Sequence, residues 1–249
     1  MKKIVFAFLV MLAILPAKLF ASDVEAKEPA FTTTLAADFF NRYIGPSGTK
    51  YTGDEVYQPA VTIEHQSGLY LSVWGSGAFD SKKKAGNEID YLAGWAGDVG
   101  AVSLDVGVGY YDFEKMFDGR RENAWALFAE VSKEYELKDV GLTLTPSFRF
   151  EEDIPEPGSS YKRDFYTTVG VELRKQVVEK AEVYVLPALT YDNGVYGLES
   201  CATISAQLGV DISVSEEMKI KPTTIYYLPF EKGDRDNEFV LGIGIEYVF

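Results

Sequence analysis

The chain has 249 residues, a formal net charge of −14, one histidine and one cysteine. So large an acidic excess argues against nucleic-acid binding, which needs basic patches to meet phosphates. The single cysteine, Cys201, excludes an intramolecular disulfide. The mean hydropathy of −0.07 resembles that of an ordinary soluble protein, but this average conceals a regular alternation of apolar and polar residues.

The first residues have the pattern of a secretory signal. Lys2 and Lys3 precede an apolar run over residues 4–17, which is shorter than the roughly 20 residues that a spanning helix needs. We therefore expect residues 1–21 to be a signal peptide and residues 22–30 a flexible lead-in to a single domain. The alternative is an uncleaved membrane anchor.

Segments that alternate with period two recur from residue 31 to the end. In the last one, residues 238–249, one face is Phe, Leu, Ile, Ile, Tyr and Phe, and the other is small or acidic. Because the side chains of a strand point to alternate faces, this segment predicts a strand with one apolar side. We expect about twelve strands, which begin near residues 31, 57, 69, 87, 101, 122, 141, 161, 182, 197, 218 and 238.

The connections between these segments alternate between long and short. Long polar stretches are expected at 44–55, 80–86, 114–121, 152–160 and 230–237, and tight turns at 66–68, 97–100, 136–140 and 215–217. The alternation weakens at 176–180 and 192–195. Long loops at one end and short turns at the other are typical of an outer-membrane barrel, whereas a Greek-key sandwich has no reason to alternate in this way.

Residues 31–249 are therefore predicted to form an all-β, closed antiparallel transmembrane β-barrel with both termini in the periplasm. In hydrocarbon every backbone polar group needs a partner within the protein, and only a closed sheet leaves no edge. Prolines at 59, 146, 187 and 222 each remove one ladder bond, so we expect them near strand ends or at bulges. A soluble β-domain that happens to end on an aromatic residue is the alternative.

Several stretches of the first half resemble the TorF-type porins, a conserved bacterial family. The resemblance is carried by the order and spacing of short Gly- and aromatic-rich motifs at residues 38–43, 59–65, 67–70, 72–76, 88–97 and 105–111. The sequence departs from the family at Ile44-Gly45-Pro46, where members often have an Arg-Gly pair, and the match is loose in the second half. The resemblance implies an outer-membrane porin and no particular substrate. In outer-membrane barrels a C-terminal aromatic residue, here Phe249, usually serves as the signal for the barrel-assembly machinery, so we expect that partner.

The inventory of reactive residues gives little support to catalysis. His65 stands beside the predicted turn at 66–68, too local to Ser67 to suggest a designed dyad. No cluster of His and Cys suggests a transition-metal site. Gly107-x-Gly109 precedes no helix and so does not predict a phosphate loop. We expect neither an enzyme nor a bound cofactor or metal.

The polar faces of the predicted strands supply candidate lumen-lining residues. Acids outnumber bases fourteen to five among them. They are Asp38, Arg42, Glu64, Glu88, Asp90, Asp105, Glu130, Arg149, Glu151, Asp164, Glu172, Arg174, Glu182, Glu199, Asp211, Lys219, Lys221, Glu238 and Glu246. If water fills the lumen, its negative potential should favour cations. Alternatively, the charges pair across a packed interior and conduct nothing, since twelve strands lie between filled small barrels and open porins.

Two functions follow. The first is a narrow passive channel for small solutes with a weak cation preference. The second is a non-conducting surface protein with an adhesion, sensing or structural role. Its basic loop runs, Lys82-Lys83-Lys84 and Arg120-Arg121, also suit contacts to anionic lipopolysaccharide. The expected partners are outer-membrane lipid, lipopolysaccharide and small solutes, and nucleic acid is not among them.

Overall fold

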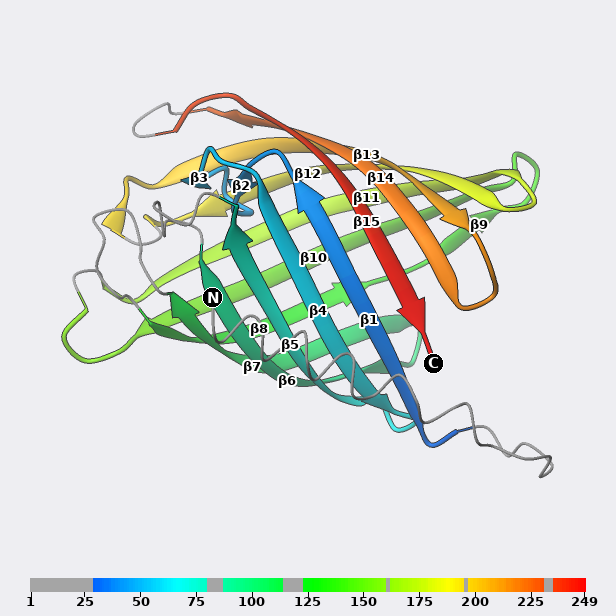
Figure 1. Ribbon diagram of the computed structural model, residues 1–249, viewed down its shortest axis with the longest axis horizontal. Coiled ribbons are helices and arrows are strands. Elements are labelled where there is room, and N and C mark those ends of the chain that lie inside the picture. Colours follow the sequence, from blue (N-terminus) through cyan, green and yellow to red (C-terminus); the bar gives the residue numbers. More distant parts are fainter. Residues whose placement is uncertain (1–28, 80–86, 114–122, 160–161, 195–196, 231–234) are drawn as a thin grey trace.

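The computed structural model describes residues 29–79, 87–113, 123–159, 162–194, 197–230 and 235–249, and these form fifteen strands (Figure 1). The predicted signal peptide, residues 1–21, lies outside the described residues. The strands are β1 (Phe31–Phe40), β2 (Tyr43–Ile44), β3 (Lys50–Thr52), β4 (Val56–His65), β5 (Leu69–Ala78), β6 (Glu88–Val99), β7 (Val102–Phe113), β8 (Ala124–Ser132), β9 (Tyr135–Leu137), β10 (Leu142–Pro155), β11 (Asp164–Val178), β12 (Ala181–Asp192), β13 (Cys201–Ser213), β14 (Met218–Pro229) and β15 (Glu238–Val248). Among the described residues, no helix is long and apolar enough to cross a membrane.

Twelve of the strands form a closed antiparallel barrel, which confirms the predicted fold class. Each long strand pairs with the next along the chain, and β15 closes the ring by pairing with β1, from Thr34 opposite Val248 to Phe40 opposite Gly242. The short β9 prolongs the line of β8 along β10. Strands β2 and β3 form a separate two-stranded hairpin.

The connections separate the two ends of the barrel. Tight turns at 66–68, 100–101, 138–141, 179–180 and 214–217 lie at one end, here called the turn end, together with the end of β15 (Figure 1). The strand ends that the longer connections join lie at the other end, here called the loop end. The alternation of long and short connections, which is weak in the sequence at 176–180 and 192–195, is regular in the structure. The reason is that β11 extends to Val178 and β13 begins only at Cys201.

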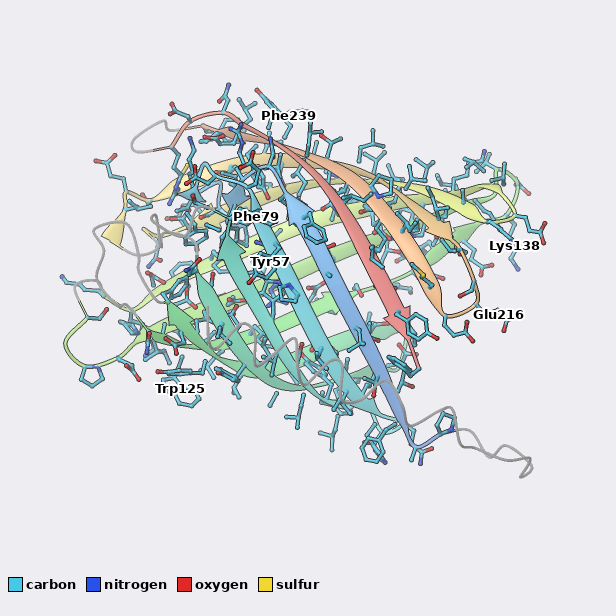
Figure 2. The ribbon with its side chains drawn as sticks, viewed as in Figure 1. Tyr57, Phe79, Trp125, Lys138, Glu216 and Phe239 are labelled. Atoms are coloured by element: carbon cyan, nitrogen blue, oxygen red, sulfur yellow. The ribbon has the colours of Figure 1, made fainter. Side chains whose placement is uncertain are left out.

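The two faces of the wall differ in character. The outward face carries exposed apolar side chains, such as Leu71, Val169 and Leu241, and aromatic residues such as Trp125 and Phe239 that point away from the barrel (Figure 2). The inward face carries the polar residues of the alternation, and some reach past a neighbouring strand: the Tyr70 hydroxyl of β5 donates to Asp105 of β7 at 2.9 Å. Side chains can meet across an intervening strand in this way on the concave side of the sheet, so this polar face is the inner face of the barrel.

The prolines at 59, 146, 187 and 222 lie inside strands rather than at their ends, which corrects the expectation. The ladder is interrupted beside each of them: between Tyr57 and Ala60 for Pro59, and likewise for Pro187 and Pro222. Pro146 lies opposite the gap between β8 and β9. The register is the same on both sides of every interruption, so no bulge is needed. Each proline removes a donor from the ladder, and the strand pairing absorbs this loss locally.

Several inward aromatic rings lie over glycines of the neighbouring strand. The register places each ring directly opposite a glycine, and a Cβ on that glycine would overlap the ring. The pairs are Phe40–Gly242, Tyr70–Gly94, Phe128–Gly107 and Tyr184–Gly209. The rings therefore cover the glycine backbone of the neighbouring strand.

Replacing Gly94 with alanine is expected to destabilise the barrel by about 1–3 kcal/mol, because the added Cβ would lie 2.6 Å from the Tyr70 hydroxyl oxygen. Gly75→Ala is the matched control, since a Cβ there would lie 3.5 Å from the nearest atom, the Glu88 carbonyl oxygen. The measurement is urea unfolding of the purified protein in lipid vesicles, followed by gel mobility of unheated samples. Equal midpoints for the two variants would contradict the role assigned to the ring–glycine pairs.

Candidate functional site

The connection after β1 folds into the barrel. The stretch predicted as a long polar loop at 44–55 contains the β2–β3 hairpin, and inward residues of the wall surround it. Ser47, Thr49 and Thr52 of this connection are buried. The sequence showed polar and glycine residues here, which suit a loop. It did not reveal that two of their partners, Thr203 and Arg235, lie more than 150 positions away along the chain.

On one side the hairpin contacts β13, β14 and β15. The Thr203 hydroxyl of β13 donates to the Ser47 carbonyl at 2.8 Å. Ile44 packs with Tyr227 of β14 and Val240 of β15. Glu238, the first residue of β15, forms ion pairs with both Arg42, just before β2, and Lys50, the first residue of β3.

On the other side the hairpin contacts β5, β6 and β7, close to the opposite wall of the ring. The Tyr43 hydroxyl donates to Glu88 of β6 at 2.8 Å, and its ring lies 5.8 Å from that of Trp74. Burial, together with the charge of Glu88, raises the pKa of Tyr43 well above its ordinary value, so this hydroxyl remains a donor. Tyr51 stacks on Phe113 of β7 at 6.0 Å. The hairpin therefore bridges the lumen.

Arg235, in the connection between β14 and β15, also joins the hairpin to the barrel wall. Its guanidinium forms an ion pair with Asp192 of β12 at 2.8 Å, and its Nε donates to the Thr49 hydroxyl at 3.2 Å. Arg235 is 3% exposed, and Asp192 is fully buried. Burial lowers the pKa of the Arg235 guanidinium, but the hydrogen bonds to Asp192 and Cys201 and the charges of these two residues together raise it above its ordinary value. The ion pair therefore persists at neutral pH.

These contacts fill the loop-end part of the lumen, here called the packed half. Inward residues from ten neighbouring strands are at most 5% exposed there. They are Val56, Ser76, Glu88, Phe113, Ala124, Ala126, Phe128, Glu151, Asp153, Asp164, Thr190, Asp192, Cys201, Thr203, Glu238 and Val240. Polar and charged residues make up more than half of this set, which is unusual for packing of this density.

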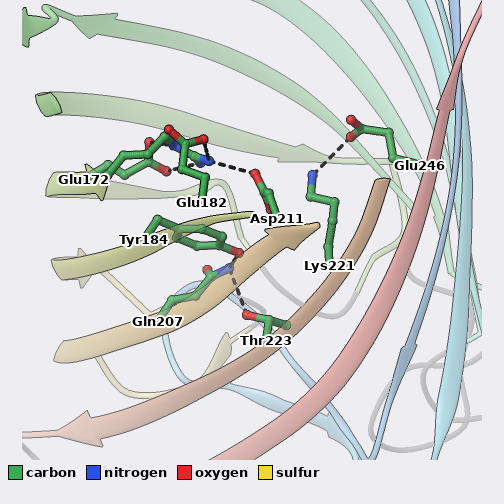
Figure 3. A network of polar contacts seen from close by, with 9 residues as sticks. Glu172, Glu182, Tyr184, Gln207, Asp211, Lys221, Thr223 and Glu246 are labelled. Atoms are coloured by element: carbon green, nitrogen blue, oxygen red, sulfur yellow. Dashed lines mark hydrogen bonds and ion pairs between the residues drawn. The ribbon is translucent and has the colours of Figure 1, made fainter. Parts of the chain in front are cut away.

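The turn-end part of the lumen, here called the open half, has accessible charged side chains. Its centre is Arg174 of β11, which contacts three carboxylates from three adjacent strands: Glu172 at 2.9 Å, Glu182 at 2.9 Å and Asp211 at 2.7 Å. The guanidinium lies over the Tyr184 ring. Figure 3 shows this network beside the Lys221–Glu246 pair, whose atoms are 3.0 Å apart. Arg174 and Lys221 are 25% and 33% exposed, so water reaches them.

A second arginine cluster lies between the two halves. Arg149 of β10 contacts Glu151 at 2.6 Å and Glu130 at 3.5 Å, and its guanidinium lies over the Phe128 ring. This repeats the Arg174 arrangement, in which an arginine covers an aromatic ring that covers a glycine. In both clusters the carboxylates outnumber the arginine. The ion pairs therefore leave a net negative charge on the wall.

The strand register places nearly all of the predicted lumen-lining strand residues on the inward face. Inward positions are occupied by Asp38, Glu64, Glu88, Asp90, Asp105, Glu130, Arg149, Glu151, Asp164, Glu172, Arg174, Glu182, Asp211, Lys219, Lys221, Glu238 and Glu246. Arg42 follows β1 and reaches Glu238. Glu199 is the exception: it is exposed in the connection before β13, because that strand begins two residues later.

Other predicted features lie elsewhere. His65 points outward at the turn end, where its Nδ1 is 2.8 Å from the Ser67 hydroxyl and its ring contacts Phe31. The basic runs Lys82-Lys83-Lys84 and Arg120-Arg121 lie outside the described residues.

The sequence reading missed several residues of the packed half. Asp153 and Asp192 continue the inward phase of β10 and β12, and extending the alternation by one or two residues would have found them. Lys50, Tyr43 and Arg235 lie outside any alternating strand, so the pattern carried no signal for them.

Comparisons with known proteins agree with this architecture. KdgM porin matches with a TM-score of 0.53 and 10% identity, covering 88% of this chain and 99% of the other. An outer membrane channel from Pseudomonas putida F1 matches with a TM-score of 0.56 and 11% identity, over 92% and 99%. The beta domain of the Bordetella autotransporter BrkA gives 0.54 and 16% identity, over 88% and 99%. These likenesses concern the fold alone.

At the level of sequence, no curated protein matches the chain. One family model does, over residues 24–183, which is more than half of the chain. Its members are described as bacterial proteins of unknown function. The chain belongs to this family, Gcw_chp.

Proposed function

We propose that the protein is an outer-membrane channel for small solutes, passive and weakly cation-preferring. The observation that carries this is the open half of the lumen, where water-accessible carboxylates outnumber the bases that they pair with. A barrel whose only task was mechanical could fill this space with apolar side chains at no loss of stability. The resemblance of the motifs to TorF-type porins, and the channels and porins among the structural neighbours, agree with the proposal.

The outward face supports the membrane location. Its exposed apolar strand residues would be covered by lipid chains, since a contiguous surface of this kind is rare on soluble monomers. Outward aromatic pairs lie at both ends of the wall: the rings of Tyr110 and Trp125 contact each other at the loop end, and those of Tyr247 and Phe249 at the turn end. In this placement the turn end faces the periplasm, and Phe249 is available to the barrel-assembly machinery.

The charge of the lumen supports the cation preference. Arg174 has three acidic partners and Arg149 has two, and Asp38 lies near the Lys221–Glu246 pair. A negative potential in a narrow pore with low-dielectric walls concentrates cations and repels anions.

The packed half favours the second function, a barrel that does not conduct. With the hairpin in its observed position, buried residues of the described part of the chain close the loop end. Such a barrel would serve as a scaffold for its surface loops.

Recordings from purified protein in planar bilayers under a KCl gradient distinguish the two functions. We expect discrete single-channel steps. The reversal potential should have the same sign as the equilibrium potential of K⁺, which shows that K⁺ permeates more readily than Cl⁻. The same preparation after heat denaturation serves as the control. Silence over a wide range of voltage, or a reversal potential set by chloride, would contradict the proposed channel.

A further inference from the structure

The β2–β3 hairpin is too small to hold its own position. Its two strands are joined at only two paired positions, Tyr43–Thr52 and Ile44–Lys50. A two-stranded hairpin of this size is marginal in water. Its place in the lumen therefore depends on its contacts with the barrel wall.

One carboxylate joins both strands of the hairpin to the wall. Glu238 forms ion pairs with Arg42, just before β2, and with Lys50, the first residue of β3. Glu238 is 3% exposed, whereas its two partners are 32% and 44% exposed. The cations can therefore be hydrated when they leave, and the carboxylate is held mainly by them.

The wall beneath the hairpin suits water as well as protein. Glu88 and Thr203 contact the hairpin directly, and the other buried inward residues of the packed half include Gln58, Ser76 and Thr190. A permanent plug would be stabilised better by apolar side chains, because buried polar groups cost free energy unless they are fully paired. Withdrawal of the hairpin would expose a surface that water can solvate.

We propose that the β2–β3 hairpin is a gate, and that Glu238 is the latch that keeps it closed. In the open state the hairpin leaves the lumen toward the loop end, and the ion pairs to Glu238, the Thr203–Ser47 bond and the Tyr43–Glu88 bond are broken. The gate rests on the proposed channel function, because without conduction there is nothing for it to control.

The latch is tested with Glu238→Gln, with Glu246→Gln as the matched control. Both residues lie on the inward face of β15 and both form ion pairs, but Glu246 pairs with Lys221 in the open half, away from the hairpin. In single-channel recordings we expect the open probability of Glu238→Gln to rise about tenfold. Because Glu246 lines the open half, Glu246→Gln should change the current of each opening, whereas its open probability should stay that of the unmodified protein. An unchanged Glu238→Gln, or an equal rise in both variants, would overturn the latch.

Replacing residues 43–52 by a short Gly-Ser linker separates the gate from the channel. We expect this variant to be constantly open, with an unchanged gel mobility that shows the barrel to be folded. If it carries no current, the channel function itself is wrong and the gate with it. If the unmodified protein is as open as this variant, the channel remains and the gate is wrong.

Discussion

Replacing Asp192 with alanine is expected to destabilise the barrel by about 3–5 kcal/mol. The variant leaves the Arg235 guanidinium in the packed half, where it is 3% exposed and has lost its carboxylate partner. A buried charge without a partner still carries its desolvation cost but has lost the attraction that offset it. The variant should therefore lose more stability than one in which a neutral polar side chain is removed. Urea unfolding in lipid vesicles measures the effect.

The exposed ion pair of Lys138 and Glu136 provides the control. Its atoms are 3.8 Å apart and its side chains are 83% and 64% exposed, so Glu136→Ala should change stability by no more than about 0.5 kcal/mol. Removing both members of the buried pair, in Arg235→Ala with Asp192→Ala, should cost less than the sum of the single changes, because no charge is then stranded. Equal unfolding midpoints for Asp192→Ala and Glu136→Ala would show that the loop end is not closed as described.

Neutralising the three acids around Arg174 is expected to reverse the ion preference of the channel. In a variant with Glu172→Gln, Glu182→Gln and Asp211→Asn, the amide oxygens still accept hydrogen bonds from Arg174, but its positive charge is unopposed. We expect the cation-to-anion permeability ratio, taken from the reversal potential in a KCl gradient, to fall about tenfold.

The control for this change removes the same number of carboxylates outside the lumen. Glu179, Glu216 and Glu217 are exposed acids of the turns, and Glu216 lies at the turn end in Figure 2. Their replacement by glutamine should leave the permeability ratio nearly unchanged, because exposed charges are screened within about 10 Å at 0.1 M salt. Equal shifts for the two triple variants would mean that surface charge, and not the Arg174 cluster, sets the preference.

The alternation was sufficient to predict the barrel, because strand side chains must face lipid or lumen in turn. Most predicted strand starts lie within a few residues of the observed ones; β5, β14 and β15 begin at Leu69, Met218 and Glu238 as expected. The largest difference is at β13, where the alternation extends back from Cys201 into the preceding loop. Polar and apolar residues alternate in that loop although they pair with no other strand. For this reason the pattern wrongly assigned Glu199 to the lumen.

The interior of the barrel could be predicted only in part. Period two fixes which face a residue takes, so the acids and bases of the wall could be assigned to one surface. It does not indicate which of them meet, since Arg174 and Asp211 lie on strands separated by β12. The fold of the 44–55 connection depends on contacts with residues such as Glu238, about 190 positions away along the chain, and local sequence carries no record of these.

The ring–glycine pairs are a feature that the sequence contained but that required the register to be seen. Glycines at 94, 107, 209 and 242 occupy inward positions, and the alternation alone does not indicate which side chains cover them. Their pairing with Tyr70, Phe128, Tyr184 and Phe40 follows from strand offsets that tight turns and strand lengths set together.

The central claim is that ions pass through this lumen, and neighbouring cysteines on β5 test it most directly. Ser72 faces inward and Val73 outward, so each is replaced by cysteine in a Cys201→Ser background, and a charged methanethiosulfonate reagent is added during a planar-bilayer recording. The account predicts a stepwise change in current for Ser72→Cys and none for Val73→Cys. Current that is indifferent to modification of Ser72→Cys would contradict it, as would a change of equal size at the two positions.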